Sequence, residues 1–372
     1  MKMRTTSPGT LFTSFVAVLL FIAGLGVSGP ALAGSHHGGH GHGHGHGHGH
    51  GQGYGPGKIV VADRASGTIS VISARTDELL ATVDLPPGDN APEPMYVVFS
   101  PAQRRVFVGD RANDRVVAFD ARTFSVVGTA AAGAGVFHMW SSNATRELWV
   151  NNDIDNTISV IDTRTLETKA VIDAPADLVA LGARPHDVFV SPGGFLAYVS
   201  FLGIPGGPGY VVQYDTWTRE EIGRAMVGDD PHLSLTPRTP YLYVPAQGSG
   251  MVHVLNRFSM EPVADIAVPG AHGAGMARNG RFFYTTNLPG GGTDALWTID
   301  TMTNTLVGDP VDTPYGVPHN IALTPNGRKL YVTHSGENDK VTIFRTRGRN
   351  PVPEYLGEVT VGLNPFGLAY VY

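Results

Sequence analysis

The sequence predicts an all-β fold, namely a seven-bladed β-propeller in which the N- and C-terminal strands close one composite blade. The chain repeats itself about every 40 to 50 residues, and each repeat holds several short strand patterns. Glycine and proline recur between these patterns, with 48 Gly, 27 Pro and only 16% charged residues in the chain. Such a composition suits many short strands joined by tight turns.

Residues 1–33 are predicted to be an export signal. Lys2 and Arg4 supply the positive start, residues 11–27 the apolar run, and Ala-Leu-Ala at 31–33 the cleavage pattern. An uncleaved membrane anchor is the alternative, but Ser, Thr and Gly interrupt the run. No later stretch approaches the roughly 18 apolar residues of a membrane span. We therefore expect a periplasmic or secreted protein without a membrane span.

Residues 34–57 form a low-complexity leader of glycine and histidine. Glycine loses so much backbone entropy on folding that this segment should be disordered on its own. Imidazole is a common ligand for zinc, copper and nickel, so the leader is predicted to bind metal with little selectivity. A solubilising leader or an engineered tag is the alternative. Its histidines are His36, His37, His40, His42, His44, His46, His48 and His50.

Residues 58–372 are predicted to form the propeller. The stretch 58–84 lacks an innermost strand, and residues 364–372 supply one that nothing follows. Pairing these two ends gives the seventh blade and removes an exposed sheet edge. The six full units begin near Glu93, Gly135, Arg184, Asp230, Ala271 and Val317.

The second strand of most units ends in a Tyr-Val-polar motif or a variant of it. The motifs are Tyr331-Val332-Thr333, Tyr243-Val244-Pro245, Tyr198-Val199-Ser200, Tyr284-Thr285-Thr286-Asn287 and Leu148-Trp149-Val150-Asn151. They resemble the YVTN-type β-propeller repeat family across the propeller segment. The resemblance implies the fold and leaves the function open, because such propellers serve as enzymes, binders and scaffolds.

Five histidines open the innermost strand of successive repeats, where the strands of a propeller meet near its axis. These are His138, His186, His232, His272 and His319. Aligned on the Tyr-Val motif, His138 and His232 fall one residue later than the other three. An offset of one reverses a side chain within a strand, so whether these two share the site stays open. A structural hydrogen-bonding role for all five is the alternative.

The second strand returns to the same face of a propeller, which adds candidates at its end. His334 is predicted to lie near His319 as a sixth ligand, whereas His253 lies in mid-strand and is expected to be an ordinary surface residue. Zinc accepts three or four imidazoles, and copper accepts the same ligands. The sequence therefore predicts a zinc or copper ion at this ring. Oxygen ligands or hydrogen-bond acceptors could come from Asp63, Asp110, Asn151 and Asn287.

The overall composition excludes several classes of function. With no cysteine, the chain has no disulfide, thiolate nucleophile or Cys-based zinc site. Its formal net charge of −6 argues against nucleic acid as a partner, because phosphate binding needs a basic surface. No catalytic residues are assigned, since no group of nucleophile, base and acid stands out.

The arrangement of a His-rich leader on an exported, acidic propeller resembles the periplasmic zinc metallochaperones. That resemblance implies metal storage or transfer by a monomer, with a periplasmic solute-binding protein or another metal acceptor as partner. The propeller domain of nitrous oxide reductase, which is also similar, carries an electron-entry domain that this chain lacks. A metal-dependent enzyme, either a copper redox protein or a hydrolase, and a non-catalytic interaction scaffold are the alternatives.

Overall fold

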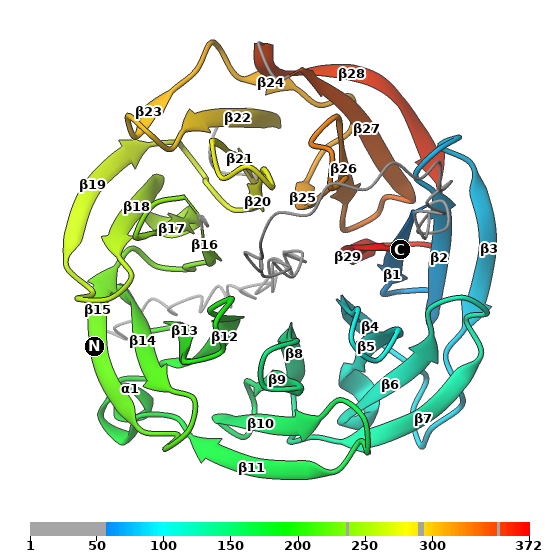
Figure 1. The fold of residues 1–372 in the computed structure, drawn as a ribbon, viewed down its shortest axis with the longest axis horizontal. Coiled ribbons are helices and arrows are strands. Elements are labelled where there is room, and N and C mark those ends of the chain that lie inside the picture. The colour runs from blue at the N-terminus through cyan, green and yellow to red at the C-terminus, as the bar shows by residue number, and fades with distance from the viewer. Residues whose placement is uncertain (1–56, 236–237, 289–293, 348–349) are drawn as a thin grey trace, which may run out of the picture.

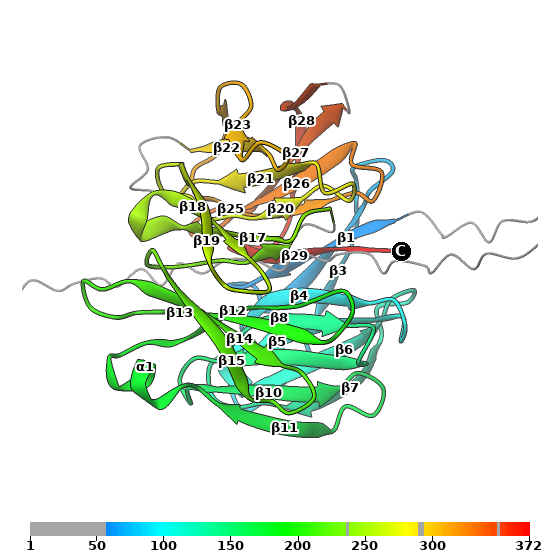
Figure 2. The same cartoon turned by 60° about the vertical axis from the view of Figure 1, so that its left-hand side comes forward.

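The fold is a closed ring of seven antiparallel sheets, as the sequence predicts. The computed structural model describes residues 57–235, 238–288, 294–347 and 350–372. The predicted signal and the leader histidines His36 to His50 lie outside these residues. Each sheet has four or five strands, and its innermost strand faces the central axis (Figure 1). Figure 2 shows the strands of neighbouring blades as successive layers.

Each blade takes its strands in chain order from the axis outwards, apart from the composite one. Blade 1 comprises β29 (Pro365–Val371), β1 (Lys58–Asp63), β2 (Thr68–Ser73) and β3 (Leu79–Asp84). Blade 2 comprises β4 (Pro94–Ser100), β5 (Arg105–Asp110), β6 (Arg115–Asp120) and β7 (Val126–Ala131). Blade 3 comprises β8 (Val136–Ser142), β9 (Glu147–Asn152), β10 (Thr157–Asp162) and β11 (Thr168–Asp173).

The remaining four blades follow the same plan. Blade 4 comprises β12 (Arg184–Val190), β13 (Leu196–Leu202), β14 (Gly209–Asp215) and β15 (Glu221–Val227). Blade 5 comprises β16 (Ser234–Leu235), β17 (Tyr241–Ala246), β18 (Met251–Asn256) and β19 (Pro262–Ala267). Blade 6 comprises β20 (Gly275–Met276), β21 (Phe282–Thr286), β22 (Ala295–Asp300), β23 (Thr305–Leu306) and β24 (Val311–Asp312). Blade 7 comprises β25 (Pro318–Leu323), β26 (Lys329–His334), β27 (Lys340–Arg347) and β28 (Asn350–Thr360).

The two ends of the described chain close the ring in blade 1. Strand β29 pairs antiparallel with β1, with Val60 opposite Ala369 and Val61 opposite Leu368. All four of these side chains are buried. The composite blade predicted from the two ends of the propeller segment is therefore confirmed. Without this pairing, the inner edge of β1 and the strand β29 would both lack hydrogen-bonding partners.

The tyrosines of the Tyr-Val motifs tie neighbouring blades together. The hydroxyl of Tyr198 donates to the carbonyl of Arg257, one blade further on, at 2.8 Å. In the same way Tyr331 of blade 7 donates to the carboxylate of Asp77 in blade 1. The rings of both tyrosines are packed between sheets, so the motif supplies apolar contact area and satisfies its one polar atom.

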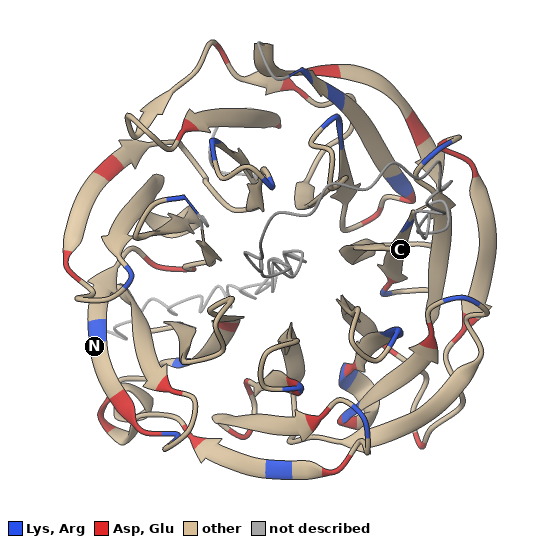
Figure 3. Cartoon of the chain, in the orientation of Figure 1, with Lys and Arg blue, Asp and Glu red and all other residues tan. Residues whose placement is uncertain are grey.

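Helical structure is a minor part of the described chain. It comprises α1 (Ala176–Ala180), between blades 3 and 4, and the 3₁₀ turns Arg111–Asn113 and Gln247–Ser249. Across the described residues, no helix has the length and apolar character needed to cross a membrane. Basic and acidic residues are interspersed around the ring (Figure 3).

Candidate functional site

A buried group of imidazoles and carboxyls lies where the innermost strands begin. We call it the histidine–carboxyl cluster. Its imidazoles are buried, and the exposed fraction of the Asp230 side chain is 16%. Asp230 is thus the most solvent-exposed member of the cluster. The members are His138, His186, His232, His272, His319, Asp187 and Asp230.

Irregular strand pairing explains how His138, which falls one residue later than His186, reaches the same cluster. The pairing of β8 with β9 shifts between Val136 and Met139, and that of β12 with β13 shifts between Pro185 and Val188. A bulge of this kind re-aims the side chains within it, so the expected reversal at His138 does not separate it from the others. The ring centroids of His138 and His186 are 4.9 Å apart.

The centre of the cluster is His232. Its Nε2 lies 3.4 Å from Nε2 of His186 and 3.1 Å from Nδ1 of His272. The ring of His272 stacks on that of His319, with centroids 4.9 Å apart. On the far side, His319 packs against Phe366, which occupies the equivalent position in blade 1. The structure therefore brings all five predicted ring histidines together.

Asp230 joins three of these imidazoles. Its carboxylate oxygens lie 3.2 Å from Nε2 of His186, 3.6 Å from Nε2 of His232 and 3.6 Å from Nδ1 of His272. Burial alone would raise the pKa of Asp230, but hydrogen bonds from His186 and His272 outweigh it. They hold the pKa of this carboxyl well below its usual range, so Asp230 is an anion at neutral pH.

The pKa of the second carboxyl, Asp187, is shifted in the opposite direction to that of Asp230. Its Oδ1 lies 2.9 Å from Nδ1 of His138, and the backbone N–H groups of Val188 and Leu233 donate to the carboxyl at 2.7 and 2.8 Å. Burial nevertheless raises the pKa of Asp187 to about 8. The cluster thus holds two carboxyls whose environments move their pKa values apart, a pattern found where one site must both give and take protons.

Burial keeps several imidazoles neutral. It lowers the pKa of His186, and it places the pKa values of His232 and His319 well below the usual range. A neutral imidazole has a lone pair that can accept a proton, and the adjacent carboxylate of Asp230 offsets part of the cost of burying the imidazolium that forms.

Four supporting residues fix the cluster from outside. Tyr96 stacks on His138 with centroids 3.9 Å apart, and Asn320 lies 2.9 Å from Nδ1 of His319. The amide of Asn151 donates to the carbonyl of His186 at 2.8 Å, so in this contact it is a donor and not the acceptor predicted from the sequence. Thr286 likewise donates to the carbonyl of His319 at 2.9 Å.

His334 points away from the ring histidines. Its Nδ1 bonds the carbonyl of Gly316 at 3.0 Å, and its Nε2 bonds the hydroxyl of Thr342 at 2.8 Å. Asp63 fills the matching position in blade 1, where its carboxylate accepts from Thr68 and Ser70. Both side chains therefore fasten the second strand of a blade to the third.

The other second-strand ends serve similar local purposes. Asp110 accepts from Arg115 at 2.9 Å, and Asn287 accepts from the N–H of Ala295 at 2.7 Å. His253 pairs with the exposed Asp265 at 2.7 Å.

Sequence reasoning missed both carboxyls of the cluster. Asp187 and Asp230 flank two of the predicted histidines, in Pro-His-Asp and Asp-Pro-His sequences. That adjacency is the signal from which they could have been found. It was obscured because no other blade has a carboxyl at the position of Asp187, and because the blade 2 counterpart of Asp230, Glu93, pairs with Arg64.

Two sets of residues could hold a metal ion. His138, His186 and His232 form one, and Asp230, His232 and His272 form the other, each with ligand atoms within 4.8 Å of one another. Imidazole and carboxylate suit zinc. The predicted zinc or copper ion stays a prediction, as do the leader's metal binding, the protein partner and the monomeric state.

The fold and the cluster define a seven-bladed propeller with proton-transfer groups at its axis. The chain belongs to a family described as "Lactonase, 7-bladed beta-propeller", whose model matches residues 41–261, more than half of its length. No curated protein matches the sequence.

Solved structures resemble the chain at low identity and so support the fold alone. The periplasmic gluconolactonase of Pseudomonas aeruginosa is 19% identical with a TM-score of 0.66, over 85% of this chain and 99% of that one. A Bacteroides fragilis protein named as a candidate 6-phosphogluconolactonase is 18% identical with a TM-score of 0.67, over 86% and 99%. Hydrazine synthase of Kuenenia stuttgartiensis is 18% identical with a TM-score of 0.64, over 77% and 91%.

These findings correct the interpretation of the chain as an exported metal-binding protein for storage or transfer. That interpretation is wrong, because the family is one of lactonases and not of metallochaperones. The physical reason for the error is that imidazoles gathered on an axis serve proton transfer as well as metal ligation. The likeness to the YVTN-type repeat family is not confirmed beyond the seven-bladed fold.

Proposed function

We propose that this protein hydrolyses a lactone to the corresponding hydroxy acid at the histidine–carboxyl cluster. The single observation that carries the proposal is the position of Asp230, an ionised and partly exposed carboxylate in contact with three imidazoles. Membership of the lactonase family supports the choice of substrate class.

The reaction requires one proton to be taken and one to be given. Water adds to the carbonyl carbon of the lactone and loses a proton to an imidazole of the cluster, and Asp230 stabilises the resulting imidazolium. The tetrahedral intermediate then collapses, the bond from the carbonyl carbon to the ring oxygen breaks, and that oxygen takes the proton back. The sum is lactone plus water giving hydroxy acid, with the site restored.

Asp187 is a positioning residue in this scheme. Its carboxyl is enclosed by two backbone N–H groups and fixes the orientation of His138 through Nδ1. An oriented imidazole transfers protons faster because fewer of its conformations are unproductive.

Export is part of the proposal. The signal predicted at residues 1–33, the leader at 34–57 and the propeller at 58–372 form the proposed domain plan. The periplasmic location named for the Pseudomonas aeruginosa relative supports a periplasmic or secreted protein.

The test is a pH-stat assay of ring opening with aldonolactones and unsubstituted γ- and δ-lactones. We expect His232→Gln to lower kcat by about 100-fold or more, the usual scale of general acid–base catalysis. The matched control is His253→Gln in the same blade, which changes a histidine outside the cluster that pairs with Asp265 and accepts from the N–H of Gly228. Equal rates for the two variants, or no ring opening by the wild-type protein, would overturn the proposal.

A further inference from the structure

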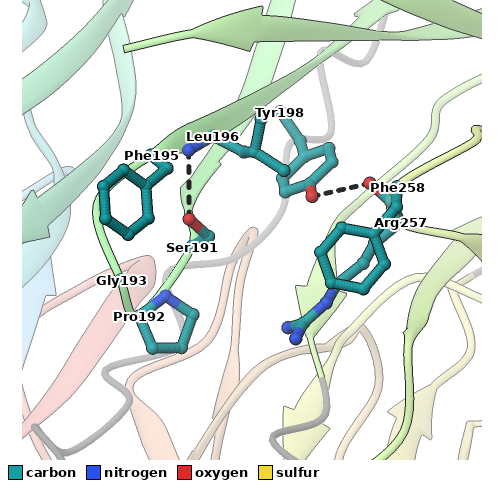
Figure 4. Close-up of a pocket in the computed structure, with 8 residues that line it drawn as sticks. All are labelled: Ser191, Pro192, Gly193, Phe195, Leu196, Tyr198, Arg257 and Phe258. Carbon is teal, nitrogen blue, oxygen red and sulfur yellow. Dashed lines mark hydrogen bonds between the residues drawn. The ribbon is translucent and has the colours of Figure 1, made fainter. Parts of the chain in front are cut away.

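A pocket of about 270 Å³ lies between the turns of blades 4 and 5, away from the histidine–carboxyl cluster. One wall is the turn between β12 and β13, and the other is the turn that follows β18 (Figure 4). His186 lies near the start of β12 and Ser191 just past its end, about 16 Å further along the strand. The pocket therefore opens on the opposite face of the ring. Its lining residues are Ser191, Pro192, Gly193, Phe195, Leu196, Tyr198, Arg257 and Phe258.

Arg257 departs from the internal repeat of the chain. In each blade the residue after the third strand donates its N–H to a carbonyl of the turn before the second strand, as Arg257 does to Pro240 at 2.8 Å. The backbone is thus the same in all seven blades. The equivalent residues are Ala74, Ala121, Thr163, Thr216, Thr301 and Thr346, all of them small.

The small residues have an evident local purpose. The hydroxyls of Thr163, Thr301 and Thr346 each donate to a carbonyl of the preceding turn. Arginine at this position cannot form the threonine hydroxyl's hydrogen bond, and it brings a positive charge between two blades. The local fold does not require an arginine here, because the neighbouring blades form the same turn with alanine or threonine.

The guanidinium of Arg257 is left without compensation on two of its nitrogens. Nε and Nη1 are both buried, and neither has a hydrogen-bond partner in the described part of the chain. Burying N–H donors of a cation without an acceptor costs about 1 to 3 kcal/mol or more per group. Two hydrogen bonds to the carbonyl of Arg257, from Tyr198 and Gln213, nevertheless hold the residue in place.

The walls around this cation are apolar and exposed. The exposed fractions of Phe195 and Phe258 are 76% and 59%, and the Arg257 guanidinium lies over the Phe258 ring at 4.8 Å. Pro192 and Leu196 complete the apolar lining (Figure 4). A guanidinium with unsatisfied donors attracts a carboxylate, and aromatic walls match an apolar body. The volume limits the body to about the size of a single ring.

We propose that this pocket binds a small organic acid, whose carboxylate pairs with Arg257 and whose aromatic or branched body packs on Phe195 and Phe258. This site is separate from the proposed lactone hydrolysis and does not depend on it. The carboxylate supplies an acceptor to one edge of this guanidinium, since Nε and Nη1 lie on different edges and a single carboxylate does not satisfy both.

The test is a calorimetric titration of the whole mature protein with 3-phenylpropionate, its neutral amide and inorganic phosphate. We expect saturable binding of the acid that is about 10- to 100-fold tighter than that of the amide, the range given by hydrogen bonds to a charged group. Arg257→Thr should abolish this preference. Threonine is the residue that other blades carry at this position, so the variant is expected to fold, and a circular dichroism spectrum checks it.

The matched control is Arg281→Gln, since the Arg281 guanidinium already pairs with Asp300 at 2.7 Å. It should bind the acid as the wild-type protein does. Equal binding of acid and amide, or unchanged acid binding by folded Arg257→Thr, would overturn the proposal. Phosphate binding as tightly as the acid would also overturn it, because the apolar walls would then contribute nothing.

Discussion

The buried carboxyl of Asp187 should make the stability of the protein fall as pH rises from about 7 to 8. Burial raises its pKa to about 8, from 3.8 for the free side chain. Below pH 8 most of the folded protein holds the Asp187 proton, whereas the unfolded chain has released it. This carboxyl alone then lowers the free energy of unfolding by about 1 kcal/mol over the interval, because the slope of about 1.4 kcal/mol per pH unit halves as the pKa is reached.

Comparison with Asp187→Asn separates Asp187 from the cluster's imidazoles. Burial lowers the pKa values of His186, His232 and His319, so their unfolded forms bind protons that the folded forms do not. Their contribution makes stability rise with pH. It is about half complete at pH 6.5, where half of the unfolded imidazoles still hold a proton, and nearly complete by about pH 7.5. Both proteins share this contribution, so the difference between them isolates the descending contribution of Asp187.

Urea unfolding, followed by tryptophan fluorescence at several pH values between 7 and 8, measures the slope. The stability of Asp187→Asn relative to the wild-type protein should rise by about 1 kcal/mol over this interval, although the variant is less stable throughout because one backbone N–H loses its acceptor. The matched control is Asp63→Asn, since burial raises the pKa of Asp63 only to about 6 and its titration is nearly over at pH 7. A difference between wild-type and Asp187→Asn stability that does not change with pH would refute the reasoning.

Three further outcomes follow from the same structure. Lactone opening should persist as pH falls from 7 to 5.5, because buried His186 and His232 stay neutral; a pH–rate profile with a midpoint at 6.5 would contradict this. Protein treated with chelator should keep its activity, because the imidazoles and Asp230 transfer the proton; a loss of activity that zinc restores would contradict this. His334→Leu should destabilise the fold by about 2 kcal/mol in urea unfolding, since Gly316 and Thr342 lose their partner, with no change in ring opening.

Much of the fold could be predicted from the sequence because the repeat fixes it. A unit that cannot bury its own faces must stack on its neighbours, and seven inner strands close the ring. The leftover ends at residues 58–84 and 364–372 specified the composite blade. Recurrent Tyr-Val motifs marked the second strands, and in the structure Tyr198 and Tyr331 tie successive blades together.

The site could be predicted only in part, because side-chain direction depends on details that a repeat does not reveal. The bulge between Val136 and Met139 turns His138 to the cluster despite its offset. In contrast, His334 lies at the end of the second strand, from which it was expected to reach His319, but its side chain bonds to Thr342. Asp187 escaped notice because no other blade has a carboxyl at its position, and Asp230 because its counterpart Glu93 pairs with Arg64. The function escaped because the same imidazoles can bind metal or carry protons.

The central claim is that the carboxylate of Asp230 supports water addition to a lactone. Its most direct test compares kcat/KM for ring opening between Asp230→Asn and Asp265→Asn, the latter changing an aspartate that pairs with His253 at the surface. We predict a loss of about 100-fold or more for Asp230→Asn and no loss for Asp265→Asn. Equal activities of the two folded variants would contradict the account.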